Sequence, residues 1–239
     1  MLYVLPNVLD ESCNPRLFLP VQTQQIVSRL DGVICESEKK ARWYLKHFDL
    51  QVPLQQFSLA VLNEHVQGKK EECLKLLEPL KRGENWGLLS DAGSACIADP
   101  GSELVFLART LGIDVQVVYG PCSITQALQL SGFSGQRFCF HGYLPRDKGA
   151  RQQALRALEK SSRQHRETEL FIEAPYRNNE LLSDCLEVLA PQTLICTATS
   201  LDSPEMNVRV LSVSAYKKSA ATVDLHKKPT LFLVRAAGE

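Results

Sequence analysis

Short apolar runs alternate with amphipathic segments along the whole chain, and this alternation restricts the folds available to it. The runs have the length and composition of β-strands, and the segments between them carry apolar residues at helical spacing. Such an alternation favours mostly parallel sheets covered by helices. We expect strands at 2–5, 33–35, 86–90, 115–118, 138–143, 170–172, 194–196, 208–213 and 230–234. We expect helices at 23–30, 38–48, 69–81, 102–111, 123–130, 150–159 and 178–189.

The length of 239 residues suits one large domain or two smaller ones. We predict two α/β domains, 1–118 and 119–239, with the boundary near Tyr119. Lys plus Arg and Asp plus Glu number 27 each, so the formal net charge is zero and a non-specific nucleic-acid binder is disfavoured. Aromatic residues make up only 7% of the chain, which gives no sign of a base-stacking platform.

The eight cysteines are scattered singly, and no CxxC pair occurs, so we expect no metal site. Several lie in apolar runs, where reduced thiols act as small hydrophobic side chains. This pattern predicts a reducing compartment and a cytoplasmic protein. The first residues do not resemble a signal peptide, and no apolar run is long enough to cross a bilayer, so no membrane association is expected.

The most informative segment is 88–101, where an apolar run leads into a loop of small residues and then into a helix start. Ligands of open α/β sheets bind at the carboxyl ends of strands, and small residues let a ligand approach the backbone. Loop position alone does not separate binding residues from turn residues. Asp91 is also typical of a turn, and Asp99, next to Pro100, is typical of a helix N-cap.

A second segment, 118–125, repeats this arrangement with a Gly120-Pro121 turn and a Ser or Thr that can cap the next helix. It can be a simple turn and cap, or a second wall of the same ligand cleft. The sequence contains no GxGxxG motif and no Walker lysine, which argues against dinucleotide binding and nucleotide hydrolysis.

Several short motifs resemble those of the tetrapyrrole-methylase superfamily, in particular its ribosomal RNA small-subunit methyltransferase I branch. Residues 90–101 (SDAGSACIADPG) are similar to the SDAGTPxISDPG motif of that branch. Residues 138–145 (FCFHGYLP) resemble its FxFxGFLP motif, and residues 173–177 (EAPYR) resemble ESPHR. Further resemblances lie at 35–39, 63–65, 120–123 and 148–151. The motifs run in order along nearly the whole chain.

This resemblance implies two α/β domains of the tetrapyrrole-methylase type, a homodimer, and S-adenosyl-L-methionine bound in the cleft between the domains. The implied cofactor contacts are largely to the backbone. They fall on Gly93, Ser94, Ala95, Ile97, Cys122, Ser123, Glu173, Ala174, Ala198, Thr199, Pro229 and Thr230.

Two departures from the family pattern bear on the substrate. The loop after the first strand, 6–12, lacks the glycine of the family's PTPIGNL motif, and that loop lines the substrate side of the cleft in the family. Residues 197–205 lack an Arg and a Lys of the family's RELTKxxEE motif, which weakens the expected phosphate contacts. The chain therefore resembles a divergent paralogue.

Methyl transfer from a sulfonium needs an aligned nucleophile, and a ribose hydroxyl is a weak nucleophile that benefits from a general base. The candidates in family-like motifs are Glu173, Glu36 and His65. Each can equally be structural: a hydrogen-bonded loop carboxylate or a surface histidine. The candidates for substrate binding are Arg177, Lys148 and Arg151, for which a surface ion pair or a solvated helix face is the alternative.

Three functions remain open from the sequence. The first is methylation of the ribose 2′-hydroxyl of small-subunit ribosomal RNA, with rRNA or the small subunit as partner. The second is methylation of a tetrapyrrole or another small molecule. The third is a cofactor-binding protein without turnover, which the altered first loop suggests.

Overall fold

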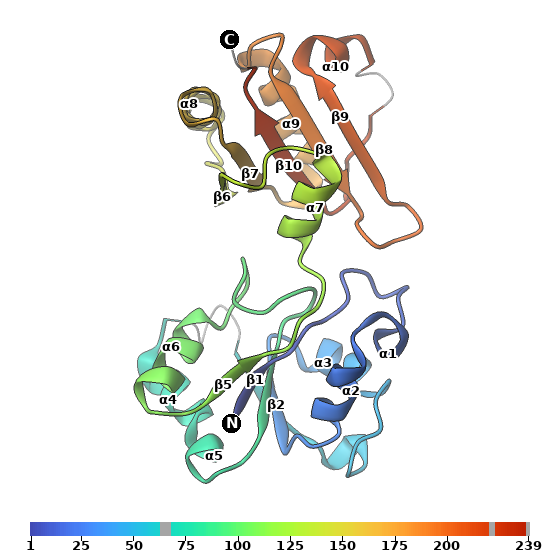
Figure 1. Cartoon of the computed structure of the whole chain (residues 1–239), viewed down its shortest axis with the longest axis vertical. Helices are drawn as coiled ribbons and strands as arrows, with labels where there is room; N and C mark the ends of the chain where they lie inside the picture. The colour runs from blue at the N-terminus through green and yellow to red at the C-terminus, as the bar shows by residue number, and fades with distance from the viewer. Residues whose placement is uncertain (63–67, 220–222, 238–239) are drawn as a thin grey trace. The chain divides into compact units, whose positions relative to one another are not determined.

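The computed structural model describes residues 1–62, 68–219 and 223–237. The chain forms two compact units, Met1–Cys122 and Ser123–Glu239, called here the N-terminal and C-terminal units (Figure 1). Each has a five-stranded sheet with helices packed against it. None of the described helices is both long and apolar enough to span a membrane.

The N-terminal sheet is entirely parallel, with the strand order β3-β2-β4-β1-β5. Its strands are β1 (Leu2–Val4), β2 (Gly32–Cys35), β3 (Ser58–Val61), β4 (Trp86–Leu89) and β5 (Val115–Val117). Every residue of β2 and β4 is buried, as expected for central strands covered on both faces. The parallel arrangement brings the carboxyl ends of all five strands to one edge.

Helices cover both faces of this sheet (Figure 1). One apolar cluster joins the sheet to α2 (Val21–Val27) and α3 (Glu38–Leu45), near α1 (Pro15–Phe18) and the 3₁₀ turn η1 (Leu54–Gln56). A second joins the other face to α4 (Lys70–Leu76), α5 (Glu78–Lys81) and α6 (Ser102–Thr110). The single helix expected at 69–81 is divided, because Pro79 cannot donate the backbone hydrogen bond that would continue α4.

The C-terminal sheet has the order β6-β7-β10-β8-β9. Its strands are β6 (Phe138–Tyr143), β7 (Thr168–Ile172), β8 (Leu194–Thr199), β9 (Asn207–Ser212) and β10 (Thr230–Arg235). Only β6 and β7 are parallel, and the other three pairings are antiparallel. The expectation of a mostly parallel sheet is therefore wrong here. The link from β8 to β9 is too short for a parallel crossover, which takes about a dozen residues or more, so these strands form a hairpin.

One face of this sheet packs on α8 (Lys148–His165), α9 (Asn178–Val188) and α10 (Val213–Ser219) around one apolar core. Phe171 of β7 and Phe232 of β10 stack within that core, with ring centroids 5.8 Å apart. The helix α7 (Ser123–Ser131) lies against β8, β9 and β10. The 3₁₀ turn η2 (Pro175–Arg177) leads from β7 into α9. The expectations did not include β3, α1 or α10.

Candidate functional site

Three loops meet where the parallel strands of the N-terminal unit end. They follow β1, β4 and β5 and comprise residues 5–10, 90–101 and 118–122. Pro6 forms an isolated antiparallel bridge with Ser94. The Asn7 N–H donates to the Gly93 carbonyl at 2.8 Å, and the Gly93 N–H donates to the Val8 carbonyl at 3.3 Å. The loop after β1 therefore pairs with the loop after β4 through backbone hydrogen bonds.

Asn7 organises this junction through its side chain. Its amide nitrogen donates to the carbonyls of Ser90 at 3.0 Å and of Asp91 at 3.1 Å. Its amide oxygen accepts the Val8 N–H at 2.9 Å. The side chain is buried, so each of these bonds replaces a contact with water. Sequence reasoning missed Asn7 because its partners lie more than eighty residues away and no local pattern marks it.

The turns after β4 and β5, which the sequence suggested as two walls of one ligand site, lie side by side. The Ser94 hydroxyl donates to the Pro121 carbonyl at 2.9 Å. A Cβ at Gly93 would lie 3.0 Å from the Leu9 side chain and 3.7 Å from the Pro121 oxygen. Gly120 approaches Pro6 so closely that an added Cβ would lie 2.1 Å from the Pro6 Cβ. Both glycines are therefore required by close packing of the three loops.

The backbone of the loop after β4 is strained. Cys96 and Ala98 have φ values of 70° and 63°, in the left-handed region that non-glycine residues rarely adopt. Gly93 and Gly101 also have positive φ, at 68° and 128°. Strained residues of this kind cluster at ligand-binding loops, where the surrounding structure holds them in place.

The expected N-cap of the next helix is wrong. Gly101, and not Asp99, is the N-cap of α6, and its conformation is one that an L-residue rarely adopts. The helix begins at Ser102, as expected, so Asp99 lies two residues before the N-cap. Asp99 is thereby left half-buried near the carboxylates of Glu36 and Asp91.

These three carboxylates follow β2 and β4. Burial and repulsion from Glu36 raise the pKa of Asp99 to about 6, although a hydrogen bond from Ser90 opposes the shift. Burial also raises the pKa of Asp91. The Asp91 N–H points to a Glu36 carboxylate oxygen at 3.5 Å. The edge of the sheet at which the strands end is therefore negatively charged and favours a cationic ligand group.

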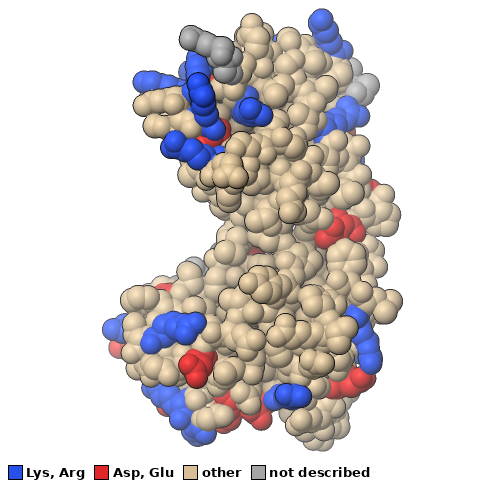
Figure 2. Space-filling model, viewed as in Figure 1, with Lys and Arg blue, Asp and Glu red and all other residues tan. Residues whose placement is uncertain are grey.

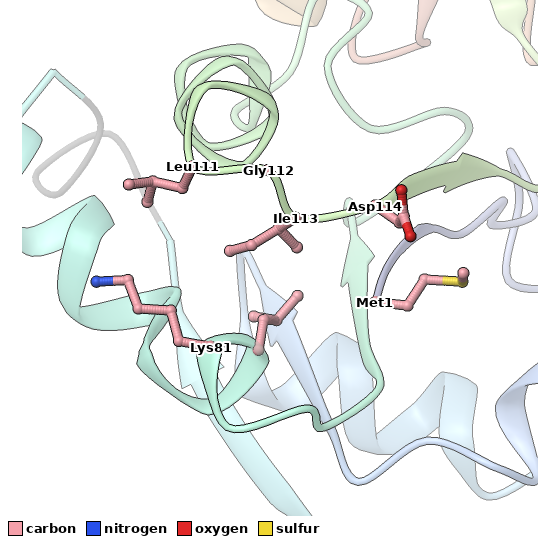
Figure 3. Close-up of a pocket in the computed structure, with 7 residues that line it drawn as sticks. Met1, Lys81, Leu111, Gly112, Ile113 and Asp114 are labelled. Carbon is pink, nitrogen blue, oxygen red and sulfur yellow. The ribbon is translucent and has the colours of Figure 1, made fainter.

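A hollow of about 320 Å³ opens beside these loops. Its walls come from residues 8–11 after β1, from Asp91 and Ala92 after β4, and from Lys40 and Trp43 of α3. A second hollow of about 350 Å³ lies where β1 and β5 begin, between Met1, Lys81 and residues 111–114 (Figure 3). Because ligands of open α/β sheets bind at the carboxyl ends of strands, the first hollow is the candidate.

A second cluster of expected cofactor residues forms in the C-terminal unit. Since β10 runs antiparallel to β7 and β8, its first residue lies beside their last ones. Thr230 is opposite Thr199, and their hydroxyls are 3.3 Å apart. Glu173 and Ala174 follow β7 directly, and the Pro229 carbonyl accepts the Ser200 N–H at 2.8 Å. Ala198 is fully buried in β8. One edge of the sheet thus gathers residues from three separate parts of the sequence.

Glu173 is the most constrained side chain of this cluster and is only 1% exposed. Its Oε1 accepts the Ala174 N–H at 2.7 Å and forms an ion pair with Arg177, four residues along the chain. Its Oε2 is buried and has no hydrogen-bond partner among the described residues. The Arg177 guanidinium also lies 5.8 Å from the centre of the Tyr176 ring. An unsatisfied buried carboxylate oxygen indicates a place for a ligand donor.

The other expected residues lie apart from these clusters or at their margins. Ala95 is buried and Ile97 is exposed in the loop after β4, while Cys122 ends the N-terminal unit and Ser123 begins α7. His65 lies outside the described residues. The Lys148 side chain is 60% exposed and forms an ion pair with Glu187 at 3.1 Å.

Arg151 is only 1% exposed, and its guanidinium is fully engaged inside the unit. Its Nε donates to Asp184 at 2.6 Å, its Nη1 donates to the Arg146 carbonyl at 2.8 Å, and its Nη2 pairs with Glu180. This position argues against the expected contact with a substrate and indicates a structural role.

Comparison with known proteins identifies the family of this chain. The sequence profile of the family Tetrapyrrole (Corrin/Porphyrin) Methylases matches residues 14–202. The chain belongs to this family. Among its curated relatives, the Ribosomal RNA small subunit methyltransferase I of Escherichia coli O157:H7 is 30% identical over 84% of this chain and 65% of that protein. The protein of the same name from Thermotoga maritima is 32% identical over 72% of each chain.

Two further relatives with that name define the extent of the match. The Pseudomonas aeruginosa protein is 33% identical over 76% of this chain, and the aligned region covers 61% of its own length. The alignments thus span just under two thirds of the first two relatives. The Vibrio cholerae protein is 28% identical over 100% of this chain and 79% of its own length.

Solved structures with a similar fold include a diphthine synthase, with a TM-score of 0.67 and 17% identity over 98% of this chain and 89% of the other. The methyltransferase CobJ has a TM-score of 0.61 and 14% identity over 99% and 94% of the two chains. These likenesses show two α/β domains of the tetrapyrrole-methylase type.

Proposed function

We propose that this chain transfers a methyl group from S-adenosyl-L-methionine to a ribose 2′-hydroxyl of small-subunit ribosomal RNA. The observation that carries the proposal is the strained loop 90–101, which Asn7 and Ser94 hold against two neighbouring loops. Because Asn7 rebuilds the loop after β1 without the family's glycine, the altered sequence there does not argue for loss of turnover. The relatives' name supports the RNA acceptor.

The residues present fit the cofactor's chemistry. Cys96 and Ala98 hold the loop after β4 in a left-handed turn, and Gly93 leaves room where a Cβ would approach Leu9. The nearby carboxylates of Glu36, Asp91 and Asp99 suit a cationic group. In the C-terminal unit, Glu173 Oε2 has no hydrogen-bond partner among the described residues, so it is left for the acceptor hydroxyl and is not assigned to the cofactor.

When bound, S-adenosyl-L-methionine supplies the methyl group and a neutral thioether leaving group. The protein has to hold the acceptor hydroxyl in line with the carbon–sulfur bond and exclude water. As the new carbon–oxygen bond forms, the hydroxyl loses its proton, and we propose Glu173 Oε2 as the acceptor of that proton. Arg177 is then a positioning residue that fixes the Glu173 carboxylate through Oε1.

The charge distribution supports an RNA acceptor. The net charge of zero conceals an excess of Lys and Arg in the C-terminal unit and of Asp and Glu in the N-terminal unit. Figure 2 shows mostly basic side chains among the charged residues on the visible face of the C-terminal unit. Lys148 is one exposed cation of this unit that could contact phosphate. A tetrapyrrole acceptor and a protein without turnover are not favoured, because the curated relatives carry an RNA methylase name.

Gly93→Ala tests the proposal against a matched control. Gly132 has φ 67°, nearly the φ 68° of Gly93, but a Cβ there has nothing within 4 Å. Both substitutions carry the left-handed penalty of about 1–2 kcal/mol, so only crowding of the loop separates them. We expect Gly93→Ala to weaken cofactor binding at least about tenfold by calorimetry, and Gly132→Ala to leave it unchanged.

Transfer itself is measured with labelled cofactor and small ribosomal subunits that lack the modification, with uroporphyrinogen as the competing acceptor. Label in ribose of the rRNA is the expected result. Cofactor binding with label in neither acceptor would contradict the proposed activity, and label in the porphyrin alone would contradict the RNA acceptor.

A further inference from the structure

Three potential metal-ligating side chains converge at the start of the parallel pair β6–β7. Cys139 and His141 alternate on β6 and so share one face, and Cys139 is opposite Glu169 of β7 in the sheet register. The Cys139 sulfur, a His141 ring nitrogen and a Glu169 carboxylate oxygen all lie within 4.8 Å of one another. His141 Nε2 and Glu169 Oε2 are 2.6 Å apart.

Glu169 is unusually placed for a carboxylate. Its side chain is only 1% exposed, and Oε1 is buried without a hydrogen-bond partner among the described residues. The nearby Ser161 hydroxyl donates to Glu167 at 2.7 Å instead. The Glu169 carboxylate is thus shielded from water, and a Cys139 thiolate would place a second negative charge within 4.8 Å of it. A cation shared by these groups would remove both the desolvation cost and the repulsion.

We propose that Cys139, His141 and Glu169 form a binding site for a divalent transition-metal ion, with Zn²⁺ as the best match. A thiolate, an imidazole and a carboxylate are all ligands that Zn²⁺ accepts, and a thiolate disfavours Mg²⁺ and Ca²⁺. Two negative ligands and one neutral ligand balance the charge of the ion. Three protein ligands leave the fourth tetrahedral position open to water, which can enter because Cys139 is exposed.

The local backbone suits such a site. The register between β6 and β7 shifts between Phe140 and Tyr143, so His141 and Gly142 together oppose one residue of β7, and Gly142 has φ 64°. A bulge of this kind re-aims a side chain and interrupts pairing of an edge strand. A metal held by two β6 residues and one β7 residue would fasten the edge strand where its hydrogen bonding is interrupted.

The absence of a CxxC motif hid this site from the sequence. Two of the ligands follow the short spacing Cys-x-His, but the third comes from another strand, 28 residues after His141. Only the pairing of β6 with β7 brings the three together. The site lies at the opposite end of β7 from Glu173. The metal-binding test therefore does not depend on the proposed methyl transfer.

The test is titration of the purified full chain with Zn²⁺ and with Co²⁺. We expect one ion per chain and a thiolate-to-Co²⁺ charge-transfer band. Loss of an outer-sphere partner costs about 10–100-fold in metal affinity, so loss of a ligand in Cys139→Ser or His141→Gln should cost at least about 100-fold. The melting temperature should rise with Zn²⁺ in the wild type only.

Two control variants keep the residue types but lie elsewhere. Cys13→Ser removes a half-buried cysteine of the N-terminal unit, and His226→Gln removes an exposed histidine. Both should bind Zn²⁺ as the wild type does. A Cys139→Ser, His141→Gln double variant that retains wild-type affinity, stoichiometry and cobalt spectrum would overturn the site, as would a wild type that binds no Zn²⁺. Circular dichroism of each variant separates a lost ligand from a lost fold.

Discussion

The two units both pack helices against a five-stranded sheet, but they differ in strand direction and in the polarity of their interiors. The N-terminal unit has a fully parallel sheet, buried on both faces between two apolar clusters. The C-terminal unit has one parallel pair, three antiparallel pairings and several buried polar groups, including Arg151, Glu169 and Asp184. In the N-terminal unit buried polar chemistry is uncharged and limited, among the described residues, to Asn7 and Ser90 in the loops after β1 and β4 and to Thr23 in α2. In the C-terminal unit it reaches into the helix layer and the sheet itself.

This difference affects how each unit responds to mutation. Loss of one partner from a buried ion network leaves an uncompensated charge, whereas loss of a loop contact leaves the apolar core intact. We therefore expect the larger stability effects at buried polar residues of the C-terminal unit. Effects in the N-terminal unit should appear mainly in ligand binding.

The largest effect is expected from Arg151→Ala. The substitution leaves Asp184 buried and without its main cation, which should lower the free energy of unfolding by about 3–5 kcal/mol. Chemical denaturation measures this change. Arg163→Ala, at an exposed position of the same helix, should change stability by less than about 0.5 kcal/mol. An equal loss of stability in the two variants would contradict the expectation that buried charged residues stabilise the C-terminal unit.

A smaller effect is expected from Asn7→Ala. It removes two side-chain donors from buried carbonyls and should cost about 1–3 kcal/mol. Because these bonds hold the loop 90–101, cofactor affinity measured by calorimetry should fall as well. The exposed Gln164→Ala of α8 is the control and should leave affinity unchanged. Unchanged affinity in Asn7→Ala would show that the loop after β1 does not organise the site.

The smallest effect is expected from Asp99→Asn. The pKa of Asp99 is raised from 3.8 to about 6 in the folded protein, so the folded state retains a proton that the unfolded state releases. Its contribution to stability is therefore fully present below about pH 4 and is lost as pH rises to about 6. Between about pH 4 and pH 6, Asp99→Asn should therefore lose about 1 kcal/mol less free energy of unfolding than the wild type, after allowance for the partial exposure of Asp99.

Denaturation curves from pH 4 to pH 7 for the wild type and Asp99→Asn measure the difference. Because Asp99 lies near Asp91 and Glu36, the difference between the two proteins reports the loss of the Asp99 carboxylate together with its repulsion of these neighbours. Parallel pH profiles would show that Asp99 does not titrate in this range. A variant that loses stability at pH 7 would contradict the sign of the effect.

Much of the fold followed from local pattern. Apolar periodicity located most strands and helices, and residues such as Trp86–Leu89 and Asn178–Val188 match their expected elements closely. Short or half-exposed elements, including β3 and α10, carried too little periodic signal to be expected. The helix α8 begins two residues before its expected range because Asp147 caps it there, with its side chain accepting the Ala150 N–H at 2.8 Å.

The sequence by itself determined the class of fold, the position of the small-residue loop after β4 and the order of the family motifs, because all three are local properties of the chain. The tertiary structure alone decided which way the C-terminal strands run, that Asn7 holds the loop after β4, and that Arg151 is buried. It also brought Cys139 and His141 to Glu169. These depend on pairings between residues distant in sequence, which periodicity and spacing do not encode.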